Sequence, residues 1–506
     1  MSISRRSFLT GAATAGLSSG LGALAYVNTV RADTVLSRNS LAIPALMDGR
    51  AEAGQTIFDL ALQAGSRQFF PGLMTPTLGI NGDFLGPTVR CRAGQNVTMK
   101  VTNKLGFAST LHWHGLHVPA KADGGPHQVI ASNAVWSPSF KIQQKGGLFW
   151  YHSHMMHRTG SQVNAGLAGL ILVEDEESSA LDLPHEYGVD DIPLVIQDRR
   201  FRDDGSFDYM TAMPDMMMGF KGDVILVNGT VSPELTLQRQ RTRLRLLNGS
   251  NARIYNIARS DGRSVVQIAT DGSLLERAVE RRSVRLGPGE RAEILVDAMP
   301  DSSFALISLP DDAGGRGPGM MGMMGAAGND AQFTILMLRA GKLDTVKTPL
   351  PDRLVDVPSW NAAKAQRTRR FVLGMGMMGG MGMRGGMGRM GGGMMGMTIN
   401  GRSMDMERID ERVPLGATEI WSISNATPLS HPFHIHDIQF RVLERDGVPA
   451  PPYERGLKDT VMVDPGETVR VITRFEDFAD PSHPYMYHCH ILEHEDAGMM
   501  GQFVVV

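Results

Sequence analysis

A short run near the C-terminus holds soft and borderline metal ligands at close spacing. Cys489 stands between His488 and His490, His494 follows five residues after the cysteine, and Met499 follows ten residues after it. A thiolate, imidazoles and a weak thioether are the ligands of blue-copper electron-transfer sites. If the run is a strand, successive side chains point to opposite faces, so the cysteine points away from its two neighbours. One tripeptide can then contact two metal centres.

Further histidines are also spaced for one strand face. They form the motifs His112-Trp113-His114, His152-Ser153-His154 and His431-Pro432-Phe433-His434-Ile435-His436. In each His-x-His pair both rings fall on the same face, whereas the offset of three puts His431 opposite His434, on the side expected of Cys489. This parity predicts a thiolate group and a histidine group. The thiolate group is His431, Cys489, His494 and Met499; the histidine group is His112, His114, His152, His154, His434, His436, His488 and His490.

An internal repeat predicts how these motifs are positioned. An apolar segment ends at Asn103, at Asn248 and at Asn425, and histidines follow the first and third at offsets of nine and eleven residues. The same offsets from Asn248 give Ile257 and Arg259. We interpret this as three copies of one β-sandwich, with metal ligands in the first and third. Charged and Pro-containing connectors place the boundaries near 175–190 and 340–368 and the domains at residues 40–178, 185–345 and 366–506.

The bulk composition agrees with a multidomain β protein. The chain has 506 residues, of which 42% are hydrophobic and 20% charged, and this length predicts more than one core. Short β-rich segments bounded by Gly, Pro and Asn recur, as at 96–102, 224–228, 291–296 and 468–473, while long helical periodicity is scarce. The net charge of −3 without a basic run argues against a nucleic-acid partner. Two cysteines exclude a disulfide scaffold; Cys91 is interpreted as a small apolar side chain in a strand.

The N-terminus predicts export. Residues 4–9 read Ser-Arg-Arg-Ser-Phe-Leu, which resembles the twin-arginine motif, and a weakly apolar stretch leads to small residues before Asp33. Residues 1–32 are therefore expected to be a signal peptide. The mature chain is expected in the periplasm without a membrane anchor. A monomer is expected, although the sequence does not fix the oligomeric state.

The four histidine motifs, in this order, resemble the signatures of the multicopper oxidases, specifically the three-domain bacterial cuprous oxidase and laccase-like branch, from about residue 40 to the end. The resemblance implies an all-β chain of three consecutive cupredoxin-like Greek-key β-sandwiches and four copper ions. It implies a type 1 copper bound by His431, Cys489, His494 and Met499, and a type 2 copper bound by His112 and His434. A type 3 pair would be bound by His114, His152, His154, His436, His488 and His490. Five histidines are left unassigned: His117, His127, His157, His185 and His483.

Reduction of dioxygen to water also needs a proton route. Asp123, which follows the first histidine motif, matches the family position implicated in this relay, and Glu495 after His494 is a second candidate. Cys489 is expected to pass electrons to the cluster through its two histidine neighbours. At the third position after His114, where the most similar family member carries an acid, this chain has His117, so the proton path differs there.

A methionine-rich tract points to the reductant. Residues 374–397 contain only Gly, Met and Arg, with ten methionines, and shorter clusters lie at 320–324 and 216–218. Thioethers are soft ligands that favour Cu(I), and glycine gives the tract no core. We interpret the tract as a Cu(I) capture segment with additional labile Cu(I); low-complexity filler would not explain the repeated choice of methionine. In the cuprous-oxidase branch a Met-rich insert falls in this region.

The leading hypothesis is a copper-tolerance enzyme that oxidises Cu(I) to Cu(II) with dioxygen as acceptor. The alternatives are a broad laccase acting on phenols and aromatic amines, and a non-enzymatic scaffold or copper-storage protein on the same fold. Manganese or iron oxidation stays open as a side activity. The intact ligand set favours an oxidase over a scaffold. The sequence does not give the redox potential or the substrate-copper ligands.

Overall fold

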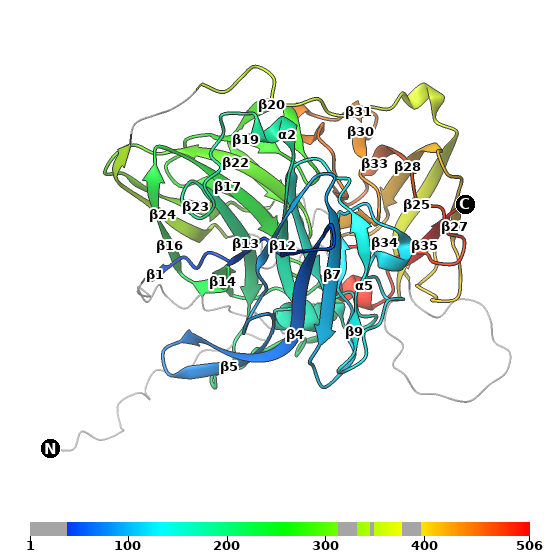
Figure 1. Cartoon of the computed structure of the whole chain (residues 1–506), viewed down its shortest axis with the longest axis horizontal. Coiled ribbons are helices and arrows are strands. Elements are labelled where there is room, and N and C mark those ends of the chain that lie inside the picture. Colours follow the sequence, from blue (N-terminus) through cyan, green and yellow to red (C-terminus); the bar gives the residue numbers. More distant parts are fainter. Residues whose placement is uncertain (1–37, 312–330, 345–348, 377–395) are drawn as a thin grey trace, which may run out of the picture. The chain divides into compact units, whose positions relative to one another are not determined.

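The computed structural model describes residues 38–311, 331–344, 349–376 and 396–506, and residues 38–506 form one compact unit (Figure 1). The expected export signal, the methionine cluster at 320–324 and residues 377–395 of the methionine tract lie outside the described residues. The chain is mostly β, which confirms the expected all-β class of three consecutive cupredoxin-like sandwiches.

The first sandwich consists of two sheets around one core. In β7 the side chains of Val97, Met99 and Val101 alternate into the core with exposed or half-exposed residues between them, the period expected of a strand with one buried face. Cys91 lies buried in this core, as its apolar interpretation predicted. One sheet has β3 (Arg50–Glu52), β4 (Gln55–Phe70), β5 (Leu73–Ile80), β7 (Asn96–Asn103), β9 (Val135–Trp136) and β10 (Ser139–Lys141); the other has β2 (Leu46–Met47), β6 (Thr88–Arg92), β8 (His112–His114), β11 (Gly147–His152) and β12 (Ala168–Glu174).

The second sandwich has its own core, formed largely by Leu, Ile and Val. The short N-terminal strand β1 (Asn39–Ser40) pairs in parallel with β16 of this sandwich. One sheet continues with β16 (Pro233–Arg239), β18 (Tyr255–Arg259), β21 (Ser283–Leu286), β23 (Ser303–Ser308) and β24 (Phe333–Asp344); the other has β13 (Asp191–Arg199), β14 (Val224–Val227), β15 (Thr230–Val231), β17 (Arg241–Asn248), β19 (Val265–Ala269), β20 (Leu274–Arg281) and β22 (Arg291–Asp297).

The third sandwich packs around aromatic residues, among them Phe371, Trp421 and Phe433, and its core includes Cys489 and Met499. One sheet has β25 (Arg367–Gly376), β26 (Gly396–Ile399), β28 (Thr418–Asn425), β30 (Arg441–Arg445), β31 (Val448–Pro449) and β33 (Thr468–Arg474); the other has β27 (Glu411–Val413), β29 (His431–Ile435), β32 (Thr460–Val463), β34 (Tyr485–Cys489) and β35 (Met500–Val505).

The strands fall into three successive runs along the chain. β12 ends at Glu174 and β13 begins at Asp191; β24 ends at Asp344 and β25 begins at Arg367. Both expected connectors thus lie largely between these strands, while the exact domain limits stay predictions. In Figure 1 most of the blue-to-cyan, green and yellow-to-red strands gather in separate groups, and the short blue strand β1 lies with the green strands because it pairs with β16.

Helices are short. They are α1 (Thr159–Ala165), α2 (Glu176–Ser179), α3 (Met213–Met218) and α5 (Leu492–Asp496), with 3-10 turns η1 (Ala120–Ala122), η2 (Ala362–Lys364) and η3 (Pro452–Glu454). Among the described residues, no helix has the length and apolar character needed to cross a bilayer.

The repeated asparagine has one structural role in all three sandwiches. Asn103, Asn248 and Asn425 are the last residues of β7, β17 and β28. Each side-chain oxygen accepts a hydrogen bond from the backbone N–H two residues on, and each amide donates to two backbone carbonyls, one nearby and one on a distant segment. This Asx turn fixes where the chain leaves the strand. It explains why the sequence repeat is visible at these positions.

Candidate metal centre

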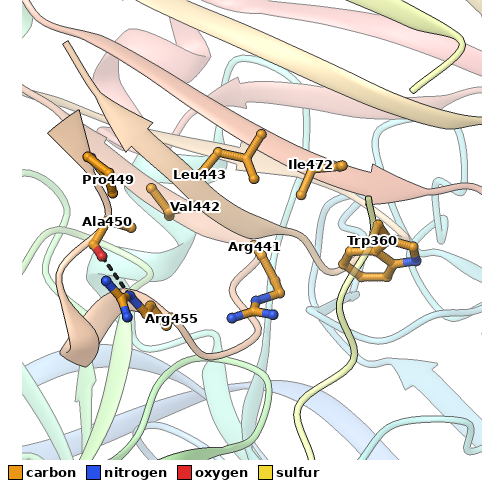
Figure 2. A pocket seen from close by; sticks show the side chains of 8 residues that line it. All are labelled: Trp360, Arg441, Val442, Leu443, Pro449, Ala450, Arg455 and Ile472. Atoms are coloured by element: carbon orange, nitrogen blue, oxygen red, sulfur yellow. Dashed lines mark hydrogen bonds between the residues drawn. The ribbon is translucent and has the colours of Figure 1, made fainter. Parts of the chain in front are cut away.

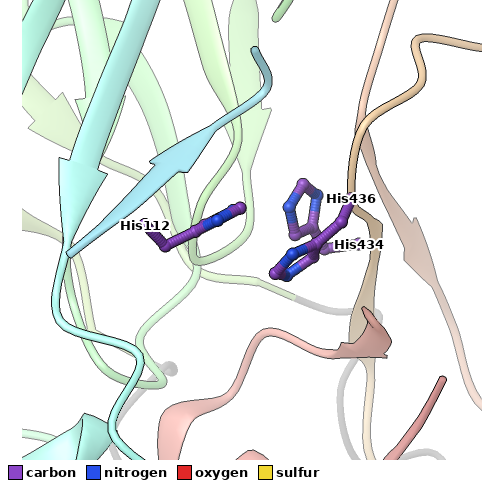
Figure 3. A group of neighbouring side chains, drawn as sticks. All are labelled: His112, His434 and His436. Atoms are coloured by element: carbon purple, nitrogen blue, oxygen red, sulfur yellow. The ribbon is translucent and has the colours of Figure 1, made fainter. Parts of the chain in front are cut away.

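Two strand pairs supply most of the eight-histidine cluster. In the first sandwich β8 and β11 place His112 opposite His152, and in the third β29 and β34 place His434 opposite His488. His112 faces His434 and His436 from across the boundary between the sandwiches (Figure 3). The rings of His112 and His436 stack at 3.9 Å between centroids. The cluster therefore exists only where the first and third sandwiches meet.

Regular strand structure includes both histidines of one His-x-His pair and only the first histidine of the other three. His112 and His114 both lie within β8, whereas His154, His436 and His490 lie just past the ends of their strands. The backbone N–H of His436 and of His490 still donates to a neighbouring strand, at 3.0 Å and 2.7 Å. These two residues keep an extended, strand-like position although the strand itself has ended.

Ring nitrogens converge at the centre of the cluster. The Nε2 atoms of His154 and His436 lie 3.3 Å and 3.2 Å from Nε2 of His488. His488 Nδ1 is bonded to the carbonyl of Cys489, and His436 Nδ1 to Asp123 Oδ2, so their Nε2 atoms carry lone pairs. Lone pairs that face one another are repulsive unless a cation lies between them. This geometry fits a shared metal ion.

Other cluster nitrogens have no hydrogen-bond partner among the described residues although they are buried. These are Nε2 of His112, His152 and His434, Nδ1 of His114 and His154, and both ring nitrogens of His490. An unsatisfied buried polar atom costs about 1–3 kcal/mol, so the seven nitrogens need compensation. The second nitrogen of four of these rings is anchored to protein oxygens: Asp123 O for His112, Ser153 O for His152, Asp459 O for His434 and Asp459 Oδ1 for His114.

Burial sets the protonation state of these rings. It lowers the pKa of the following residues well below the usual histidine value: His114, His152, His154, His431, His434, His436 and His490. Burial also lowers the pKa of His488 to about 3 and that of His494 to about 4. Neutral imidazole is the form that binds a metal ion. At neutral pH these nine imidazoles can bind a metal ion without proton release.

The second centre contains the thiolate. Cys489 Sγ lies 3.2 Å from His431 Nδ1 and 3.8 Å from His494 Nδ1, and the two Nδ1 atoms are 3.4 Å apart. The outer nitrogens are fixed, His431 Nε2 by Thr427 Oγ1 at 2.6 Å and His494 Nε2 by the carbonyl of Met217 at 3.1 Å. Burial raises the pKa of the Cys489 thiol, so metal binding must displace its proton.

Met499 lies beside this centre. Its side chain is fully buried in the same core as Cys489, and its carbonyl accepts a hydrogen bond from the Cys489 N–H at 3.0 Å. Side-chain contacts therefore place eleven of the twelve residues of the two sequence groups at one of the two centres, and the backbone contact with Cys489 places Met499 beside the thiolate centre. The backbone of residues 488–490 joins the two centres.

Both expected acids contact the cluster. Asp123 accepts a hydrogen bond from His436 Nδ1 through Oδ2 at 2.8 Å, and its Oδ1 lies 3.5 Å from Nδ1 of His112. Glu495 is buried, with its oxygens 3.3 Å from Nδ1 of His154 and from Nδ1 of His488. Burial raises the pKa of Glu495 well above the usual carboxyl value. Two carboxyl groups thus reach the ligand rings from different sides.

The sequence reasoning missed a buried ion pair at the cluster. Arg291 of the second sandwich makes two 2.6 Å bonds to Asp459 of the third, and Asp459 Oδ1 lies 2.9 Å from Nε2 of His114 in the first. Arg291 and Asp459 are both fully buried. This pair links all three sandwiches. Its only sequence signal is the position of Arg291 directly after Pro288-Gly-Glu290, a turn that recurs as Pro465-Gly-Glu467.

The five unassigned histidines have other partners. His117 bonds Asp437 at 2.7 Å and Asp477 at 3.1 Å; burial lowers its pKa, but the two carboxylates outweigh burial and raise the pKa to about 9. The others bond protein oxygens: His127 to Gln502, His157 to Asp496 O, His185 to Leu183 O and His483 to Asp480. None belongs to a metal-binding group among the described residues.

A surface pocket on the third sandwich is a different kind of site (Figure 2). Trp360, Arg441 and Arg455 line it together with apolar side chains, and Arg455 Nε donates to the carbonyl of Ala450 at 2.8 Å. The residues that line it include no histidine, cysteine, methionine or carboxylate. The pocket therefore plays no part in the two centres.

The fold and the two centres define the class: three β-sandwiches with a buried histidine cluster joined by one tripeptide to a His–Cys–His site. Comparisons with known proteins agree. Two family models, both described as multicopper oxidase, match residues 62–178 and 383–506. The multicopper oxidase mco of Staphylococcus haemolyticus is 34% identical over 92% of this chain and 93% of its own length.

Two more relatives widen the comparison. The cell division protein FtsP of Dickeya dadantii is 35% identical over 100% of this chain and 99% of its own. The structure of a laccase-like multicopper oxidase, CueO, from Ochrobactrum sp. aligns with a TM-score of 0.80 at 35% identity over 92% of this chain and 100% of that one. The chain belongs to the multicopper oxidase family, and it is an oxidoreductase that uses copper and dioxygen.

Proposed function

We propose that this enzyme couples oxidation of Cu(I) to Cu(II) to the reduction of dioxygen to water. The observation that carries the proposal is the pair of centres joined through residues 488–490. The His431, Cys489, His494 and Met499 set fits one type 1 copper. The eight histidines fit a type 2 ion at His112 and His434 and a type 3 pair at the other six, four ions in all. Copper bound at these residues supplies one-electron acceptance at the first centre and dioxygen reduction at the second.

The residues between the centres give the shortest route for electrons. Cys489 belongs to the first centre, and its carbonyl accepts a hydrogen bond from Nδ1 of His488, whose Nε2 points into the second centre. The route is therefore covalent through the backbone and is shortened by this 3.0 Å bond. Four Cu(I) lose one electron each, and with four protons they reduce one dioxygen to two water molecules.

The methionine tract supports Cu(I) as the reductant. Strands β25 and β26 pair antiparallel with Met375 opposite Met397 and Gly376 opposite Gly396, so the tract leaves and re-enters the third sandwich through one hairpin. Met375 packs against the core that contains Cys489. Met397 is buried in this core, so we assign delivery of Cu(I) to the thioethers of residues 377–395, whereas phenols need no such ligands.

Removing the tract tests the substrate. Because Gly376 and Gly396 are cross-strand partners, a two-residue Asn-Gly turn in place of 377–395 can close the hairpin. We expect kcat/KM for Cu(I) to fall about tenfold or more while phenol turnover persists or rises, measured by oxygen consumption. A length-matched variant with serine at each methionine of 377–395 controls for the linker and should lose Cu(I) turnover equally. Unchanged Cu(I) oxidation in both variants would show that the tract does not serve this substrate.

Asp123 is proposed to move protons to the cluster. In Asp123→Asn the amide oxygen can still accept from His436 Nδ1, but the side chain can no longer carry a proton. We expect oxygen turnover to fall about 100-fold or more, with the copper content unchanged. Anaerobic bleaching of the blue band by substrate should keep its rate, because Cys489 is untouched. Loss of copper or slower bleaching would mean that Asp123 only positions His436.

Export by the twin-arginine route to the periplasm completes the proposal and rests on residues 4–9. We propose that Cu(I) oxidation in that compartment serves copper tolerance. The export route can be tested by replacing Arg5 and Arg6 with lysine and fractionating the cells. The folded protein should then stay in the cytoplasm.

The full-length similarity to cell division protein FtsP makes a cell-division role the second candidate. The complete set of convergent ligand atoms favours the oxidase, because a scaffold has no need for buried, unpaired histidine nitrogens. An allele encoding Cys489→Ser separates the two candidates. If the protein is an oxidase, copper tolerance should be lost; if it has a structural role in division, division should persist.

A further inference from the structure

Helix α3 lies next to the thiolate centre and consists mainly of methionine. Its sequence is Met213-Pro214-Asp215-Met216-Met217-Met218. The carbonyl of Met217 is bonded to Nε2 of His494 at 3.1 Å, and Nδ1 of the same ring lies 3.8 Å from Cys489 Sγ. A single imidazole thus separates this helix from the sulfur. No other residue of the methionine clusters has a described hydrogen bond to a ligand of this centre.

Two thioethers on α3 are presented to solvent. Met213 is 65% exposed and Met216 is 41% exposed, while Met217 is half-buried. Residues three and four positions apart are neighbours on a helix surface, so these side chains can close on one ion. Exposed methionines contribute little to packing, so core filling does not account for them. We propose that α3 is the site where substrate Cu(I) binds and gives up its electron, with Met213 and Met216 as ligands.

The surroundings hold α3 in place for this task. Glu493, the residue before His494, accepts hydrogen bonds from Tyr209 Oη at 2.8 Å and from the N–H of Phe220 at 2.9 Å, on either side of the helix. Asp215 bonds Arg200 through both oxygens, at 3.3 Å and 2.6 Å. The segment that carries the thioethers is therefore fastened to the helix that carries the His494 ligand.

The donor set also favours release of the product. Thioether sulfur prefers Cu(I), whereas Cu(II) prefers nitrogen and oxygen ligands. The one carboxylate of α3, Asp215, is buried and already paired with Arg200. Each Cu(I) that passes one electron through His494 to the enzyme, and finally to dioxygen, becomes a Cu(II) ion that these sulfurs hold weakly.

This assignment rests on the proposed function, and silver gives a test that does not depend on turnover. Ag(I) is a soft monovalent ion that the enzyme cannot oxidise. The double variant Met213→Leu with Met216→Leu keeps the apolar volume and removes both sulfurs. The matched control is Met74→Leu with Met299→Leu, which alters two methionines that are 54% and 52% exposed elsewhere on the surface.

Calorimetric titration of the copper-loaded full-length enzyme with Ag(I) should show one tight equivalent fewer in the α3 variant than in wild type or control. The ratio of kcat/KM for Cu(I) to kcat/KM for a phenol should fall about tenfold in the α3 variant alone, mainly through KM for Cu(I). If the wild type oxidises Cu(I) but the α3 variant keeps both the kcat/KM ratio and the silver binding of the wild type, the assignment to α3 is wrong and the proposed function stands. A wild type that does not oxidise Cu(I) overturns the proposed substrate and this assignment with it.

Discussion

Cys489→Ser is expected to reduce oxygen consumption with every reductant by about 1,000-fold or more, which corresponds to about 4 kcal/mol of activation free energy. The sulfur lies 3.2 Å and 3.8 Å from two histidine nitrogens, and no other thiolate reaches them. A hydroxyl is a hard ligand that does not replace a thiolate at a blue-copper site. The protein should lose its blue colour and one copper per chain, while the histidine cluster keeps its ions.

The chain supplies a matched control for this substitution. Cys91 is also buried and free, but it lies in the core of the first sandwich and belongs to none of the possible metal-binding groups of the described residues. Cys91→Ser should keep full copper content and turnover and lose about 1–3 kcal/mol of stability, because its hydroxyl is buried without a partner. Oxygen consumption by Cys489→Ser at the wild-type rate would contradict the electron route through residues 488–490.

Arg291→Met is expected to have the largest effect on stability, about 3–5 kcal/mol of the free energy of unfolding. It removes both 2.6 Å bonds to Asp459 and leaves that carboxylate buried without its cation. Burial then favours a proton on Asp459, which alters the contact with Nε2 of His114. We therefore expect copper to be lost from the cluster as well. Metal analysis after dialysis measures the copper content, and urea unfolding of the metal-free protein measures the stability.

Arg369→Met separates the two effects. Arg369 also bonds a buried carboxylate through two nitrogens, Glu419 at 2.6 Å and 2.9 Å, but within the third sandwich alone. Its loss should destabilise the fold by a similar amount and leave the copper content intact. If Arg291→Met unfolds at a lower urea concentration yet retains all copper, the pair is structural and does not position His114.

Much of the fold was predictable because its signals are local. Alternating apolar residues, as in β7 and β33, reflect sheets with one buried face, and the asparagine at the end of β7, β17 and β28 makes the same turn three times. The β-rich segments expected at 96–102, 224–228, 291–296 and 468–473 correspond to β7, β14, β22 and β33. Strand ends were harder to predict: His154, His436 and His490 continue extended backbone just past them.

The sequence by itself predicted which residues gather at the two centres and that Cys489 points away from His488 and His490, because side-chain parity along an extended chain is a property of covalent geometry. His494 lies on helix α5, where this parity does not apply. The tertiary structure alone decided which ring nitrogen faces inward, since each depends on an oxygen from a distant segment, as with Asp459 at His114 and Met217 at His494. It also decided that Arg291 and helix α3, both from the sandwich that supplies no cluster histidine, contact the two centres. No periodicity encodes such contacts, because they arise where separately folded sheets meet.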